Sequence, residues 1–155
     1  MAFDRIMDLF HGYWAYLTIL VVALATFNAL VKFFSDRAFG QQDFKISLFA
    51  LIVTHIQVLL GFVMYFSHPS NGFGAIRNPE LSMGDIMGSA DLRLFTVEHP
   101  LVMLLSVIFI TIGYSKHKKQ LTSKAKFKSL AIFYTIAFIL IISRIPWKHW
   151  LMGSH

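Results

Sequence analysis

The chain has 155 residues, of which 56% are hydrophobic and 14% are charged, with a net charge of +6 and no cysteine. Its mean hydropathy is +0.62. Soluble domains carry about 25% charged residues, so this composition indicates an integral membrane protein. A chain without cysteine has no disulfides, no thiolate metal ligands, no iron–sulfur clusters and no covalently attached c-type haem. Any metal must be bound by histidine, methionine, tyrosine or carboxylate side chains.

Four apolar runs are each long enough to cross a bilayer as a helix. The predicted spans are 9–31, 46–66, 93–115 and 127–145, separated by connections 32–45, 67–91 and 116–126. The first run is too long for the apolar region of a signal peptide, so we expect it to be retained. The sequence therefore predicts an all-α fold, an integral membrane four-helix up-down bundle that forms a single domain over residues 1–155.

The basic residues predict the orientation of the bundle. Connections 32–45 and 116–126, with Lys128 just after them, together hold nine lysine and arginine residues against two acidic residues, whereas the opposite face holds five against six. The positive-inside rule then places these connections in the cytoplasm. We expect a multi-pass protein of the cytoplasmic (inner) membrane, with both termini and the 67–91 loop outside. The basic charge is explained by topology and anionic lipid, which leaves no reason to expect nucleic acid as a partner.

Three histidines lie within the predicted spans. At 1.5 Å per helical residue, His55 is roughly 16 Å from the outer end of its helix, and His11 and His99 are each roughly 9 Å deep. An ionisable residue inside the membrane is costly and by default indicates a functional site. Each of the three also has a structural interpretation, as an interhelical hydrogen-bonding group or as an interfacial residue.

Imidazoles on facing helices, set among apolar side chains, suit the axial ligation of haem b, which needs no covalent attachment. The pair His55–His99 is predicted first, and His11–His99 competes with it because the two depths match better. Arg144 and Trp147 are candidates to contact the haem propionates at the outer surface. Glu98 is a candidate contact for a proton path or a quinone head group, or a helix-terminal charge.

Several short motifs resemble a group of small four-span membrane proteins of Bacteroidetes that are labelled "cytochrome B". They are Leu9-Phe10-His11 with Trp14, Thr54-His55-Ile56-Gln57 continuing to Gly61, Phe95 to Leu101 with Glu98-His99-Pro100, Ile110 to Gly113, and Arg144-Ile145-Pro146-Trp147. The resemblance covers nearly the whole chain and implies haem. The chain departs from the group at Tyr13, where arginine usually precedes the tryptophan, which weakens a carboxylate-binding role for the first helix.

Together these features predict a b-type haem-binding electron-transfer subunit of a respiratory or redox complex, near a quinone site. If the complex is an enzyme, this chain is expected to be an oxidoreductase subunit. Other redox subunits, or further copies of the chain, would complete the electron path. Two alternatives stay open. His11, His55 and His99 with Glu98 could bind copper or zinc without a porphyrin, or the chain could be a structural membrane subunit without a cofactor.

Overall fold

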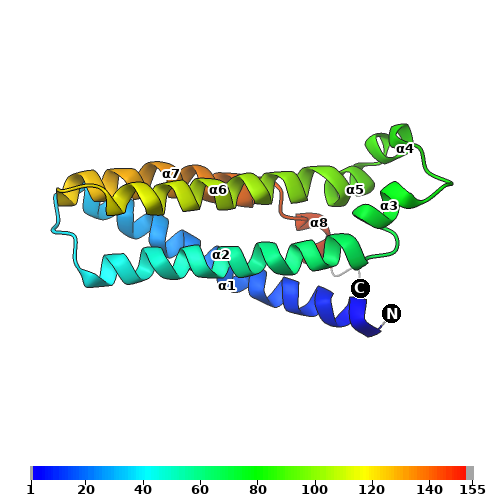
Figure 1. Cartoon of the computed structure of the whole chain (residues 1–155), viewed down its shortest axis with the longest axis horizontal. Coiled ribbons are helices and arrows are strands. Elements are labelled where there is room, and N and C mark those ends of the chain that lie inside the picture. The colour runs from blue at the N-terminus through cyan, green and yellow to red at the C-terminus, as the bar shows by residue number, and fades with distance from the viewer. Residues whose placement is uncertain (1, 153–155) are drawn as a thin grey trace.

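The computed structural model describes residues 2–152, which form helices and no strands. Four helical segments are long and apolar enough to cross a membrane. They are α1 (Ala2–Phe34), α2 (Gln41–Ser67), the continuous run α5 (Ala90–Arg93), η1 (Leu94–Glu98) and α6 (His99–Lys118), and α7 (Ser123–Ser143). They run up and down along one long axis (Figure 1). The predicted all-α four-helix bundle is confirmed, and the chain is a multi-pass membrane protein.

The connections between the helices fix the arrangement of the bundle. α1 packs on α2 and α7, and α6 packs on the same two helices, so α1 and α6 form one diagonal. The connections 35–40 and 119–122 are shorter than the predicted 32–45 and 116–126. Part of the difference lies at the helix starts: Asp43 accepts the Gly40 N–H at 2.9 Å, and Thr122 accepts the Ala125 N–H at 3.2 Å, so α2 and α7 begin earlier than their apolar runs. The rest lies at the ends of α1 and α6, which extend three residues beyond the predicted spans.

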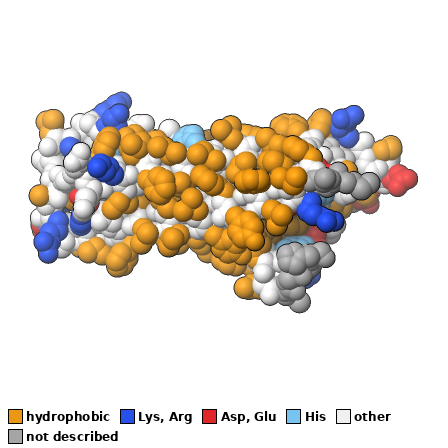
Figure 2. All heavy atoms as spheres, turned by 90° about the horizontal axis from the view of Figure 1, so that it is seen from below, with side chains coloured by type: hydrophobic (Ala, Val, Ile, Leu, Met, Phe, Trp, Pro, Cys, Tyr) orange, Lys and Arg blue, Asp and Glu red, His pale blue; other side chains and the backbone are white. Residues whose placement is uncertain are grey.

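The two ends of the bundle differ in character. The lysine-rich end holds connections 35–40 and 119–122, and the termini end holds α3 (Phe73–Arg77), α4 (Met83–Gly88) and α8 (Trp147–Met152). Between the ends, hydrophobic side chains cover the surface seen in Figure 2, while lysine and arginine side chains lie near the ends. This distribution suits a bundle whose middle contacts lipid.

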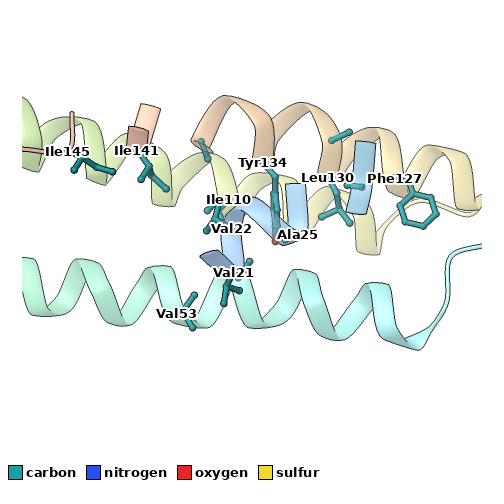
Figure 3. Packing of buried hydrophobic residues seen from close by; sticks show 14 residues of the cluster. Val21, Val22, Ala25, Val53, Ile110, Phe127, Leu130, Tyr134, Ile141 and Ile145 are labelled. Carbon is teal, nitrogen blue, oxygen red and sulfur yellow. The ribbon is translucent and has the colours of Figure 1, made fainter. Parts of the chain in front are cut away.

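The buried core runs along the bundle from Phe127, near the lysine-rich end, to Ile145, near the termini end (Figure 3). Val22, Ile110, Phe127 and Tyr134 are fully buried there. The Tyr134 hydroxyl donates to the Ser47 carbonyl at 2.8 Å, which joins α7 to α2. The close contact of α6 with α7 depends on a glycine, Gly113, because a Cβ atom at this position would lie only 2.7 Å from Phe133 Cβ.

The predicted 67–91 loop contains the short helices α3 and α4. Ser82 begins α4 with a capping box, and the hydrogen bonds that Ser82 donates to Asp85 hold the pKa of that carboxyl below its usual range. The third span begins at Ala90, earlier than the predicted residue 93, after Ser89 caps it. The fourth ends at Ser143, before the predicted residue 145, because Pro146 disfavours helical geometry in the residue that precedes it.

Candidate functional site

A cavity of about 510 Å³ lies at the termini end, among α1, α2, the η1–α6 segment, the end of α7 and α8. Its walls are mainly apolar and include Ile19, Val58, Met103 and Ile141. Its polar lining includes His11, Gln57 and His99. A cavity of this size with a few convergent polar groups is typical of a small-molecule or cofactor site.

His11 and His99 face each other across the diagonal formed by α1 and α6. Their ring centres are 6.2 Å apart and their planes are inclined at 75°. Both side chains line the cavity. The structure therefore brings together the pair whose predicted depths match.

His99 is held by the end of α7. Its Nδ1 lies 2.8 Å from the Arg144 carbonyl oxygen, so Nδ1 carries the proton and Nε2 keeps a lone pair. Metal-binding histidines usually donate their second ring nitrogen in this way, which fixes the tautomer and the ring orientation. His99 also follows the π-helix η1, in which the His99 N–H bonds the Leu94 carbonyl. Single π-turns often occur at functional sites.

His11 is contacted by two residues of α2. The Gln57 amide nitrogen donates to the His11 carbonyl oxygen at 3.1 Å and lies 3.3 Å from His11 Nε2. Gly61 makes room for the imidazole, because a Cβ atom there would lie 3.3 Å from His11 Cε1. His11 Nδ1 is buried and has no hydrogen-bond partner among residues 2–152. The contacts from α2 thus hold the carbonyl oxygen of His11 and the Nε2 side of its ring, but not Nδ1.

Two further bonds set the register of α1 against α2. Trp14 Nε1 donates to the Val53 carbonyl at 2.9 Å, and the Thr18 hydroxyl donates to the same oxygen at 3.3 Å. These bonds lie about one turn deeper than the contact between Gln57 and His11. They fix the level at which His11 enters the cavity.

His55 lies outside the cavity, on the exposed surface of the bundle. Its Nδ1 donates to the Leu51 carbonyl at 2.8 Å, and its Nε2 is 3.5 Å from the Thr111 hydroxyl. Gln57, two residues further along, is rotated by about 200° on the helix and faces the cavity. The structure therefore does not bring His55 into the cavity with His99.

The other predicted residues lie beside the cavity and do not line it. Glu98 is held between two arginines, 2.9 Å from Arg93 Nε and 3.4 Å from Arg144 Nε. Trp147 Nε1 donates to the Ile142 carbonyl at 2.9 Å. Arg144 contributes to the cavity through its carbonyl, as the acceptor for His99.

Sequence reasoning missed three histidine and aromatic positions. Trp150 and His149 line the cavity from α8, and Trp150 stacks on Tyr16 with ring centres 4.4 Å apart. The aromatic run after Pro146 is the available signal, but aromatic residues at the end of a span are equally typical of a membrane interface. His117, expected in a connection, is buried in the last turn of α6 against Tyr114 and aromatic residues near the start of α2.

No protein-family model, no curated protein and no solved structure matches the chain. Within residues 2–152, no group of three or more histidine and acidic side chains is arranged to bind a metal ion. The fold and the site thus define a multi-pass membrane protein with two opposed imidazoles in a cavity at one end of the bundle.

Proposed function

We propose that the chain is a membrane-embedded b-type haem-binding subunit for electron transfer, in which the imidazoles of His11 and His99 would hold the haem iron. The 6.2 Å separation of their ring centres carries the proposal. Two imidazoles that bind one metal ion from opposite sides, with nitrogen–metal bonds of about 2.0–2.1 Å, have ring centres about 6 Å apart. The inclination of 75° between the rings is compatible with such ligation, since each ring can rotate about its own bond to the metal.

The other groups of the cavity suit the same cofactor. His99 offers Nε2 with its lone pair, held in place by the Arg144 carbonyl. The apolar walls supply the surroundings that a non-covalently bound porphyrin requires. Arg144 and Trp147 belong to the segment that ends α7 and begins α8, and they are our candidates to meet the propionates. When bound, haem would supply one-electron chemistry, and the chain would supply ligation and a medium of low polarity.

The setting of such a subunit follows from the charges. The lysine-rich end would face the cytoplasm, and the termini end, with the cavity and the 67–91 loop, would lie outside the cytoplasmic membrane. A partner would have to deliver or remove electrons, and a second copy, another redox subunit or a membrane quinone could serve. The ion-paired Glu98 is a candidate for a proton or quinone contact near the cavity.

Copper or zinc binding without a porphyrin is less well supported. It would need a third ligand near His11 and His99, and the described residues offer no such group. A purely structural role leaves the cavity and the lone pair of His99 unexplained.

The test of the proposed function uses paired substitutions at His99. An asparagine there can still donate an amide N–H to the Arg144 carbonyl, but it lacks the imidazole lone pair. We expect the purified wild type to show a Soret band that shifts on reduction by dithionite. His99→Asn should lose this band while keeping the thermal stability of the haem-free wild type, and His99→Ala should lose the band and be less stable than the haem-free wild type.

His55→Asn is the matched control. It makes the same change on the exposed face of α2, where the amide can still donate to Leu51. The control should keep the haem spectrum. A wild-type protein without a Soret band would refute haem binding, and loss of the band in His55→Asn with retention in His99→Asn would reverse the ligand assignment.

A further inference from the structure

We propose that the two imidazoles are unequal ligands, with His99 fixed and His11 exchangeable, so that a small uncharged molecule such as carbon monoxide can replace His11 on the haem iron. This inference rests on the proposed haem site and adds a ligand-binding activity to it. It follows from the different ways in which the chain supports the two rings.

His99 has the support that a permanent ligand needs. Its Nδ1–H donates to a backbone carbonyl at 2.8 Å, and that carbonyl belongs to Arg144, whose guanidinium pairs with the neighbouring Glu98. The His99 ring is therefore held to the end of α7 by its hydrogen bond to the Arg144 carbonyl. The Arg144–Glu98 ion pair holds the same two chain segments together. Bond and ion pair both remain in place while Nε2 binds a metal.

His11 lacks an equivalent support. Its Nδ1 is buried without a hydrogen-bond partner among residues 2–152. A ligating imidazole that lacks an acceptor for its second nitrogen is a poorer donor, and loss of such an outer partner typically weakens metal binding about 10- to 100-fold. The His11 bond to iron is therefore the weaker of the two.

Gln57 adds a competitor for the same nitrogen. Its amide nitrogen lies 3.3 Å from His11 Nε2, the nitrogen that carries the lone pair when Nδ1 is protonated. When His11 leaves the iron, Gln57 can donate to this lone pair, and it also bonds the His11 carbonyl oxygen. The dissociated state of His11 is thus stabilised by a bond that the ligated state cannot make.

The lining of the cavity selects the kind of molecule that can enter. Among residues 2–152, the titratable side chains of the lining apart from the histidines are Asp8 and Tyr65, and none is lysine or arginine. The haem propionates would reach Arg144 outside the lining, but an anionic ligand at the position of His11 would be desolvated without a lysine or arginine partner in the lining, which is costly. A small neutral molecule has no such cost. Gly12, next to His11 in the cavity wall, leaves open space, because a Cβ atom there would meet nothing within 4 Å.

The test is spectroscopic and uses the full-length, haem-loaded chain in detergent micelles. Carbon monoxide is added to the dithionite-reduced protein, and the Soret band is followed. We expect a carbon monoxide spectrum from the wild type, and the same spectrum with tighter binding from His11→Ala. His99→Ala should retain no haem.

A second pair of variants tests the competitor. Gln57→Leu removes the competing hydrogen bond, so the apparent affinity for carbon monoxide should fall by about two- to tenfold, as expected for a single neutral hydrogen bond. Gln42→Leu, the same change in the first turn of α2, should leave the affinity unaltered.

The outcomes distinguish the failure of this inference, that His11 is exchangeable, from the failure of the proposed function, that the chain binds haem. A reduced haem spectrum that does not respond to carbon monoxide would overturn the exchangeable role of His11 and leave the proposed function standing. Loss of haem in His11→Ala with retention in His99→Ala would also overturn the inference. A protein that holds no haem at all would overturn the proposed function, and this inference with it.

Discussion

A pair of glycine substitutions tests the position of His11 without reference to any cofactor. Gly12 and Gly61 both line the cavity, on α1 and α2. A Cβ atom at residue 12 would meet nothing within 4 Å, whereas one at residue 61 would lie 3.3 Å from His11 Cε1. Alanine at both positions has the same effect on helix propensity, so the difference between the variants isolates the contact with His11.

The magnitudes follow from these distances. Replacing a glycine inside a helix by alanine stabilises it by up to about 1 kcal/mol, and Gly12→Ala should show this gain. Carbon atoms prefer separations of about 3.5–4.0 Å, so Gly61→Ala must displace the imidazole by a few tenths of an ångström. Overpacking of this kind costs about 1–3 kcal/mol. We expect Gly61→Ala to be less stable than Gly12→Ala by about 1–2 kcal/mol.

Thermal unfolding in detergent micelles, followed by helical circular dichroism, measures this difference. If haem binds as proposed, Gly61→Ala should also alter its absorption spectrum, and Gly12→Ala should not. Equal stabilisation by both alanines would show that His11 does not pack against Gly61, and the described cavity would then be wrong.

Three further changes test other parts of the structure. Asp43, 3% exposed, accepts a hydrogen bond from Lys32 at 2.6 Å. Asp43→Ala should therefore lower the free energy of unfolding by about 2–3 kcal/mol, which is less than the loss for a fully buried pair because Lys32 can reach solvent. An unchanged melting temperature would contradict this. Tyr134→Phe removes a buried interhelical hydrogen bond and should cost about 1 kcal/mol in the same assay, and a more stable variant would show that the bond contributes nothing. Ser82→Ala should raise the pKa of Asp85 toward its usual range in an NMR titration, because it removes the bonds donated by the hydroxyl. Since the folded-state pKa is lowered, the support that Asp85 gives to α4 is present at neutral pH and is lost as the pH falls through that pKa; a pKa that stays low in the variant would place its cause elsewhere.

The fold could be predicted because lipid imposes a simple requirement. A span must satisfy its own backbone hydrogen bonds, which a helix does, and it needs about 20 mainly apolar residues. The four predicted spans meet this length, the third only when its helix begins before Glu98. Helix ends were harder to predict, because caps extend helices beyond their apolar runs. Asp43 illustrates this: it reads as part of a polar connection, yet it lies in the first turn of α2 and is buried there.

The site could be predicted in part. Depth along a helix follows from counting residues, and counting places His11 and His99 at the same level, where the structure has their rings 6.2 Å apart. Rotation about the helix axis does not follow from the same count, since α2 has apolar residues on all sides and its sequence does not show which face is inward. The depth of His55 favours it as a ligand, but in the structure Gln57, two residues further along α2, faces the cavity and His55 does not.

The orientation of His99 depends on where α7 ends. If α7 continued beyond Ser143, the Arg144 carbonyl would be available to bond a later N–H of its own helix. Pro146 prevents that continuation, and the carbonyl instead accepts the Nδ1–H of His99 at 2.8 Å. His55 also donates its Nδ1–H to a carbonyl, but that carbonyl lies one turn back in its own helix and holds the ring on the outer surface. Both histidines therefore carry the proton on Nδ1. They differ in the position of the carbonyl that accepts it, and the carbonyl freed at the end of α7 holds the His99 ring in the cavity.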